Sequence, residues 1–355
     1  MEKKVLMKGN EAIAEAAIRS GCRHFFGYPI TPQTEISAYM AKRMPKIGGT
    51  FLQAESEVAA INMVYGAAGA GARVMTSSSS PGISLKAEGI SYIAGADLPC
   101  VIVNMVRGGP GLGGIQPAQS DYFQAVKGGG HGDYHLLVLA PNSVPELSEL
   151  TMKAFDLADN YRCPVMILGD GTLGQMMEPV VFDDDYKPDI PEKPWATVGT
   201  GGRRKHNVIN TLYMTPEDLE YTVVEREKKY DLIKSNEVRY ESIYADDAEY
   251  IVCSYGTTSR VVQTAVEGLR AEGIKIGTIR PITLWPFPYE ALNKAADKAR
   301  MFFSVEMSMG QMVEDVRLAV NGKAPVYFMG RTGGVIPTPS EVADGIKEII
   351  GGERK

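Results

Sequence analysis

The amino-acid sequence predicts an α/β protein with a doubly wound parallel sheet, followed by a smaller α/β domain. Three observations lead to this prediction. Short apolar runs alternate with helical segments from Phe25 to Leu168. The alternation stops in a polar, proline-rich stretch, and it resumes at about Glu249. Strands that alternate with helices favour a parallel sheet with helices on both faces.

Residues 1–175 are expected to form the first domain. Asn10 is a candidate cap for its first helix. The helix expected at 58–72 is rich in Ala and Gly, which predicts very close packing against a neighbour. The expected strands, in chain order, end near Phe26, Gln53, Ser77, Val106, Ala140 and Leu168.

Residues 176–247 are expected to be an extended connector with one exposed helix. The stretch is rich in Pro, Asp, Lys and Glu, and Thr215 before Pro216 is typical of a helix start. Residues 248–355 then return to the βα pattern, with strands expected at 250–253, 274–279, 301–305 and 326–329. The proline-rich turn at 280–288 is expected to be a loop, and it is also a candidate subunit contact.

Composition excludes several function classes. The net charge of −6 argues against a nucleic-acid-binding surface, which is usually basic. No apolar run reaches the ~20 residues that a membrane-spanning helix needs. The start, Met1-Glu2-Lys3-Lys4, lacks the apolar core of a signal peptide, so a cytoplasmic location is expected. The four cysteines lie far apart, so we expect buried thiols and neither a metal site nor an iron–sulfur cluster in this chain.

Two short segments stand where predicted strands end. The first is Tyr28-Pro29-Ile30-Thr31-Pro32, a proline-bracketed loop, and the second is Gln53-Ala54-Glu55-Ser56-Glu57. Open α/β sheets bind their ligands at the carboxyl edge of the strands. A carboxylate in the first turn of a buried helix is costly unless it has a partner. Together the segments predict half of a cofactor site, with Glu57 touching the cofactor.

A glycine-rich segment, Gly109–Gly114, fits the dinucleotide pattern GxGxxG and follows a predicted strand. A dinucleotide site needs the glycines to open directly into a helix. Here Pro117 interrupts such a helix and Pro110 stiffens the segment, so we expect a mobile or ligand-facing loop instead.

These segments resemble the α subunit of the 2-oxoacid:ferredoxin oxidoreductases, which depend on thiamine diphosphate. The resemblance covers nearly the whole chain, and it implies a pyrimidine-binding domain followed by a transketolase C-terminal-like domain. Details at Ala54–Glu57 and Ser77–Pro81 are most similar to the 2-oxoisovalerate (3-methyl-2-oxobutanoate) class, with the 2-oxoglutarate class as the near neighbour. The motifs that carry the resemblance are Tyr28–Pro32, Ser56-Glu57, Arg107-Gly108-Gly109-Pro110 and Gln116-Pro117-Ala118-Gln119.

The resemblance assigns roles to single residues. Glu57 matches the catalytic, cofactor-binding glutamate that hydrogen-bonds the aminopyrimidine ring and so activates the thiazolium carbon. Glu55 is better explained as a carboxylate near the helix N-terminus that the helix dipole stabilises. Arg107 matches the arginine that binds the substrate carboxylate, for which a guanidinium offers a bidentate fork. An ordinary surface role for Arg107 is the alternative.

Thr31 matches the threonine whose hydroxyl reaches the substrate oxygens, with a simple turn residue as the alternative. The residues before it are expected to shape the wall of the substrate pocket; they are Tyr28, Pro29 and Ile30.

The resemblance also implies the reaction and its other components. A 2-oxoacid is oxidatively decarboxylated with coenzyme A as co-substrate, and the electrons go to external ferredoxin. Thiamine diphosphate is shared with a β subunit that binds its diphosphate, while Mg²⁺ and [4Fe–4S] clusters belong to partner subunits, among them a ferredoxin-like subunit and a γ subunit. Gly169-Asp170-Gly171 resembles the start of the family's metal motif, but the Asn that completes it is missing. The isolated chain is therefore expected to be inactive.

Two alternatives stay open. The chain is either half of another thiamine diphosphate enzyme with a different acceptor, or an assembly subunit without catalysis. Substrate choice leans toward branched-chain acids, because neither Tyr28–Pro32 nor Gly108–Gln119 contains a second cation for the distal carboxylate of 2-oxoglutarate.

Overall fold

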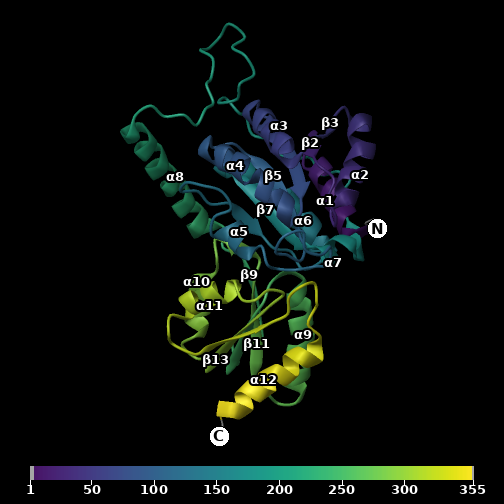
Figure 1. The fold of residues 1–355 in the computed structure, drawn as a ribbon, viewed down its shortest axis with the longest axis vertical. Helices are drawn as coiled ribbons and strands as arrows, with labels where there is room; N and C mark the ends of the chain where they lie inside the picture. The colour runs from purple at the N-terminus through teal and green to yellow at the C-terminus, as the bar shows by residue number, and fades with distance from the viewer. Residues whose placement is uncertain (1–3, 354–355) are drawn as a thin grey trace.

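The computed structural model of the chain describes residues 4–353. Met1, Glu2 and Lys3 lie outside the described residues. They belong to the segment Met1–Lys4, from which we expected that the chain has no signal peptide. Two α/β units lie one above the other along the longest axis of the molecule (Figure 1). Within the described residues, no helix is both long and apolar enough to cross a membrane.

The first unit is built on a seven-stranded sheet, with the strand order β12-β6-β7-β5-β4-β2-β3. All neighbours in it are parallel except β12, which pairs antiparallel with β6. The strands are β2 (His24–Gly27), β3 (Thr50–Gln53), β4 (Val74–Ser78), β5 (Cys100–Val106), β6 (Leu137–Leu139), β7 (Pro164–Asp170) and β12 (Thr283–Trp285).

Helices cover both faces of this sheet, as the sequence predicts. Alternate residues of β5 point to opposite faces: Ile102 packs with one buried cluster and Val103 with the other. The first cluster lies under α3 and α4, and the second lies under α1, α2 and α6. The helices of this unit are α1 (Gly9–Arg19), α2 (Thr34–Arg43), α3 (Glu57–Gly69), α4 (Ser80–Gly95), α5 (Tyr122–Val126), α6 (Val144–Tyr161) and α7 (Gly171–Gln175), with a 3-10 turn η1 (Met44–Ile47).

The second unit has a five-stranded sheet in the order β14-β13-β10-β11-β9, parallel except for β9. Helices α9 and α12 pack on this sheet in a separate apolar cluster, whereas α10 and α11 pack in the cluster that also lies under α3 and α4. Its elements are β9 (Tyr240–Ile243), β10 (Tyr250–Cys253), α9 (Gly256–Ala271), β11 (Ile276–Pro281), α10 (Tyr289–Ala295), β13 (Met301–Glu306), α11 (Met312–Val320), β14 (Val326–Gly330) and α12 (Pro339–Glu353).

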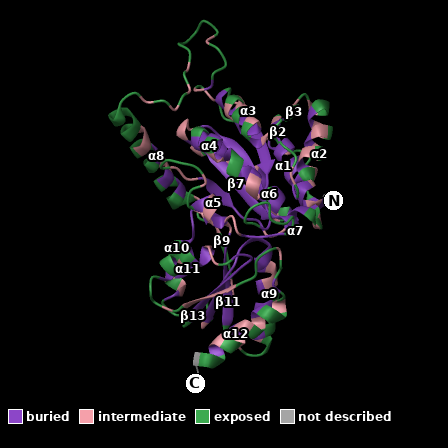
Figure 2. Ribbon diagram, in the orientation of Figure 1, coloured by how far each residue is buried: buried purple, intermediate pink, exposed green. Residues whose placement is uncertain are grey.

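The stretch expected to be an extended connector is more structured than predicted. Strand β8 (Met177–Val181) pairs antiparallel with β1 (Lys4–Lys8). Helix α8 (Pro216–Asn236) begins as expected, because Thr215 Oγ1 accepts a hydrogen bond from the Asp218 amide at 3.3 Å. Most of the helix is exposed (Figure 2), and its buried residues are Arg226, Tyr230 and Ile233. Tyr230 is buried there, with its ring against His135 and Trp285.

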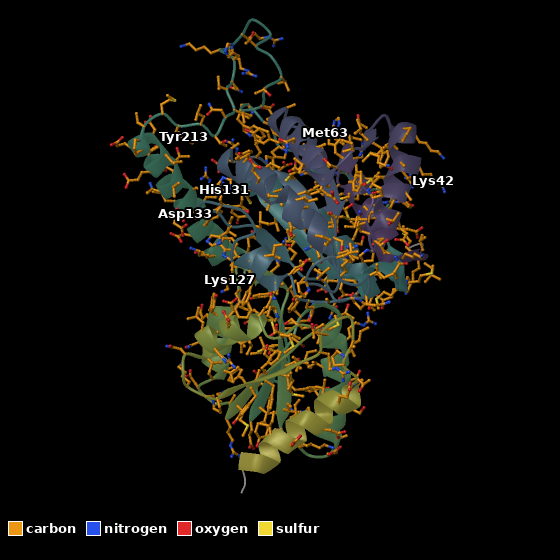
Figure 3. All side chains as sticks on the ribbon, viewed as in Figure 1. Lys42, Met63, Lys127, His131, Asp133 and Tyr213 are labelled. Atoms are coloured by element: carbon orange, nitrogen blue, oxygen red, sulfur yellow. The ribbon has the colours of Figure 1, made fainter. Side chains whose placement is uncertain are left out.

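Strand β12 also departs from the expected layout. It lies between elements of the second unit in the chain, yet it extends the first sheet by pairing with β6. The expected loop at 280–288 therefore contributes a strand that ties the two units together. At the same boundary, Lys127 (Figure 3) forms an ion pair with Asp315 of α11.

Gln119 forms the most extensive polar contact between the units. Its Nε2 donates to the Tyr255 carbonyl at 2.8 Å, and its Oε1 accepts from Thr258 Oγ1 at 2.8 Å and from the Met307 amide at 3.0 Å. The Gln119 amide in turn donates to the Met307 carbonyl at 2.8 Å. The loop that carries Gln119 is thereby fixed to the second unit.

Replacing Gln119 with Met should lower the stability of the protein. The side chain keeps its size but leaves three buried polar groups without partners, and each costs about 1–3 kcal/mol. Thermal unfolding measures the effect, with Gln116→Met as the control because Gln116 is exposed. Equal melting temperatures for the two variants would contradict the role given to Gln119.

Candidate functional site

The carboxyl ends of β2, β3, β4, β5 and β7 meet at one edge of the first sheet, because these strands are parallel. The loops that follow these strands, together with the first turn of α3, contain the predicted cofactor- and substrate-binding residues. Gln119, at the end of the β5 loop, joins this edge to the second unit. The loops are therefore positioned both by the first sheet, from which they extend, and by the second unit, to which Gln119 binds.

Glu57 is the first residue of α3, and only 6% of it is exposed. The helix begins there because Ser56 Oγ accepts a hydrogen bond from the Ala59 amide at 3.1 Å. Among the described residues, no donor hydrogen-bonds the Glu57 carboxylate. A buried carboxylate without a donor requires one from elsewhere.

Gly82 of α4 lies directly against this carboxylate. A Cβ placed on Gly82 is 2.7 Å from Glu57 Oε1 and 2.1 Å from Ser78 Oγ, so only glycine fits there. Ser78 Oγ is itself buried and without a hydrogen-bond partner in residues 4–353. A carboxylate and a hydroxyl are thus held together, both free to bind a polar ring.

Lys86 is a buried cation near the same carboxylate. It is fully buried, and its Nζ donates to Thr76 Oγ1 at 2.5 Å and to the Ser77 carbonyl at 3.2 Å. Burial lowers the pKa of Lys86 to about 7, and the negative charge of Glu57 opposes this shift. No sequence motif pointed to Lys86, although its place four residues after Gly82 puts both on one face of α4.

Arg107 brings the two predicted loops together. Its Nη1 donates to the Thr31 carbonyl at 3.0 Å, and its Nη2 donates to the Leu112 carbonyl at 3.2 Å. The residue is 7% exposed, so it is not an ordinary surface arginine. Its Nε is buried and has no hydrogen-bond partner among the described residues. A buried guanidinium with a free donor is suited to an anion.

The Tyr28–Pro32 loop lies beside Arg107. Tyr28, Pro29 and Thr31 are exposed and Ile30 is half-buried, so their side chains are available to a ligand. Two buried side-chain amides, neither of them predicted to belong to the site, hold this loop. Asn10 Nδ2 donates to the Pro32 carbonyl at 2.8 Å, and Gln33 accepts from Ser77 Oγ at 2.5 Å.

Asn10 corrects an expectation. It is the second residue of α1 and does not cap it, because the N-cap is Lys8. An asparagine side chain can cap a helix or bind a loop carbonyl with the same amide group. The sequence alone therefore did not distinguish these two roles for Asn10.

The glycine-rich segment forms an exposed loop, as expected. Gly114 donates to the Gly108 carbonyl at 2.9 Å, and the next helix, α5, begins only at Tyr122. The glycines therefore do not open into a helix. Leu112 and Ile115 on this loop are 85% and 57% exposed.

The Gly169-Asp170-Gly171 segment has a structural role in this chain. Asp170 Oδ1 accepts from the Thr172 and Leu173 amides at 2.9 and 3.1 Å and so caps α7. Burial raises the pKa of Asp170. In residues 4–353, no group of three or more His, Cys, Asp or Glu side chains is arranged to hold a metal ion. The four cysteines are buried and free.

The chain matches two family models. The model of the thiamine diphosphate-binding part of pyruvate flavodoxin/ferredoxin oxidoreductases covers residues 15–250. The model of core domain II of pyruvate:ferredoxin oxidoreductase covers residues 248–342.

Named relatives match over almost the full length. Ketoisovalerate oxidoreductase subunit VorB of Methanothermobacter thermautotrophicus is 51% identical over 98% of each chain. The 2-oxoglutarate synthase subunit KorA of the same organism is 37% identical over 98% of this chain and 100% of its own.

Two solved structures are similar in fold. One is 2-oxoglutarate:ferredoxin oxidoreductase from Magnetococcus marinus with 2-oxoglutarate, coenzyme A and succinyl-CoA bound; the TM-score is 0.85 and the identity 29%, over 98% of this chain and 66% of that one. The other is a split-gene transketolase with a TM-score of 0.60 and 15% identity, covering 96% of this chain and 97% of its own, a similarity of fold alone.

Replacing Arg107 with Met should loosen both loops at this edge. The Thr31 and Leu112 carbonyls lose their donors, and the loss is expected to cost about 1–3 kcal/mol. Hydrogen–deuterium exchange of residues 28–33 and 109–116 should become faster, while Arg203→Met, at an exposed position, should leave it unchanged. Unchanged exchange in the Arg107 variant would show that the guanidinium does not hold the loops.

Proposed function

The chain belongs to the 2-oxoacid:ferredoxin oxidoreductase family of oxidoreductases, as its motifs predicted, and we propose that it is the subunit of a 2-oxoisovalerate:ferredoxin oxidoreductase that activates the cofactor and captures the substrate. The observation that carries the proposal is the buried, donor-free carboxylate of Glu57 beside Gly82. The 51% identity to a ketoisovalerate oxidoreductase subunit supports the choice of substrate.

The residues around Glu57 fit the aminopyrimidine ring of thiamine diphosphate. The carboxylate is buried and free to bind a ring nitrogen, and the absence of a side chain at Gly82 leaves room beside it. The buried hydroxyl of Ser78 offers a second polar contact. When bound, thiamine diphosphate would supply a nucleophilic carbon for the 2-oxo group and a cationic thiazolium ring as the electron sink for decarboxylation. Glu57 would hold the ring and share a proton with its nitrogen.

Arg107 and Thr31 would hold the substrate. The free Nε of Arg107 is a donor for the carboxylate next to the 2-oxo group, and the hydrogen bonds to Thr31 and Leu112 fix the guanidinium in place. The Thr31 side chain is exposed at the same edge. Tyr28, Pro29 and Ile30 would form the wall of the pocket.

The side-chain end of the substrate would meet apolar groups. Leu112 and Ile115 are exposed on the loop that Arg107 holds, and this loop contains no further Arg or Lys. The isopropyl group of 2-oxoisovalerate is compatible with such a loop. The second carboxylate of 2-oxoglutarate would find no cationic side chain on this loop to pair with.

Other components would come from partner subunits. We assign the diphosphate and Mg²⁺ site to a β subunit, since Asp170 is committed to capping α7. The [4Fe–4S] clusters would lie in partner subunits, among them a ferredoxin-like subunit, and a γ subunit would complete the complex. Coenzyme A would accept the acyl group, and external ferredoxin the electrons.

The complex purified with its partner subunits should reduce ferredoxin or a viologen dye with 2-oxoisovalerate and coenzyme A, and more slowly with 2-oxoglutarate or pyruvate. The apolar loop at Leu112 and Ile115 is the reason for this order. The ratio of kcat/KM values measures it. Preference for 2-oxoglutarate would contradict the substrate assignment and leave the reaction class standing; no reduction in a complex that holds thiamine diphosphate would favour another acceptor.

Replacing Glu57 with Gln should lower kcat of the complex by about 100-fold or more, because general acid–base groups contribute about 10²–10⁴-fold. Glu55→Gln is the matched control, since Glu55 is exposed two residues earlier. Steady-state turnover with saturating thiamine diphosphate separates catalysis from binding. Wild-type turnover in the Glu57 variant would instead favour an assembly subunit that does not catalyse.

A further inference from the structure

Lys86 is a fully buried lysine of α4 whose amine reaches β4. Helices α3 and α4 approach each other closely at two glycines. A Cβ on Gly82 would be 2.7 Å from Glu57 Oε1, and a Cβ on Gly89 would be 2.5 Å from Ile61 Cγ2. Lys86 lies between these glycines on the same face of α4, since residues four and three apart share a face.

The direction of the lysine side chain favours Glu57. Side chains of an α-helix lean toward its N-terminus, which here is the end where Gly82 touches the Glu57 carboxylate. Nζ donates to Thr76 Oγ1 and to the Ser77 carbonyl, so two of its three protons are engaged at β4. Neither acceptor is charged.

Charged and titratable groups near Lys86 are few. The ones that interact with its charge are Glu57 of α3 and Cys100 of β5. Burial raises the pKa of Cys100, so its thiol is neutral. Glu57 is therefore the anion that compensates a lysine whose isolated burial would be costly.

We propose that Lys86 is the counter-cation of Glu57 and a positioning residue that sets how the Glu57 carboxylate shares a proton with the ring of the bound cofactor. The inference deepens the proposed function and rests on it. A positive charge beside the carboxylate favours its ionised form. The shared proton is then held more by the ring nitrogen than by Glu57.

The sign of the effect follows from this arrangement. Below about pH 7, where Lys86 carries its charge, it repels an added proton and so lowers the proton affinity of the pair formed by Glu57 and the ring. Removing its charge should raise the pH at which the pair loses its proton, by on the order of one unit for a neighbouring charge. It should also weaken the binding of the ring, because the carboxylate becomes a poorer partner for a protonated nitrogen.

Two variants in the complete complex separate the charge from the hydrogen bonds. Lys86→Met removes both, whereas Lys86→Gln removes the charge and keeps a donor for Thr76. Ile90→Met is the matched control, since Ile90 is buried one turn further along α4. The readouts are the pH titration of the circular dichroism of bound thiamine diphosphate, the Kd of the cofactor and the melting temperature of the cofactor-free complex.

Both Lys86 variants are expected to move the titration to higher pH and to weaken cofactor binding at least threefold, with Ile90→Met like wild type. An effect in Lys86→Met alone would mean that Lys86 only tethers β4, and no effect in either would mean that the buried lysine is inert; both results overturn the inference. Wild-type complex that binds no thiamine diphosphate would instead overturn the proposed function, independently of Lys86.

Discussion

The close contact between α3 and α4 is the constraint on which the site depends. The two helices follow neighbouring loops of one sheet edge, and they approach so closely that Gly82 and Gly89 leave no room for a Cβ. This contact buries the first turn of α3, and with it Glu57. A carboxylate that would be hydrated at an ordinary helix start is therefore desolvated and available to one partner only. The glycines of α4 make the approach possible, because Gly82 lies against Glu57 and Gly89 against Ile61 of α3.

One buried acidic side chain and two buried basic side chains lie near one another at this edge of the sheet. Glu57 carries a carboxylate, Lys86 an amine whose pKa burial lowers to about 7, and Arg107 a guanidinium, and all three side chains are buried. Arg107 is held by carbonyl oxygens of the two loops, and Lys86 by a hydroxyl and a carbonyl of β4. Neutral acceptors orient these cations without cancelling their charge. The charges thus remain able to act on an anionic substrate and on Glu57.

The sequence predicted the parallel sheet, the order of the elements and the loops of the site, because these follow from local periodicity and from motifs. It did not predict that β12 returns to the first sheet, since a three-residue strand has almost no pattern of its own. It also did not identify Asn10, Gln33 or Lys86, since polar residues in helical segments are expected to be capping or exposed. Their burial depends on contacts between segments far apart in the chain, such as Asn10 with Pro32.

The position of Gln119 explains why the second unit matters to a site on the first. The loop from Arg107 to Gln119 carries the substrate-facing residues, and it is anchored at both ends: by the guanidinium to Thr31, and by the Gln119 amide to Tyr255 and Met307. Gly334 of the second unit approaches the same loop, since a Cβ there would be 2.3 Å from the Gln116 Cβ. An exposed glycine-rich loop without such anchors would sample many conformations. The second unit restricts the free loop to residues 109–116, the part that carries the exposed side chains of Leu112 and Ile115.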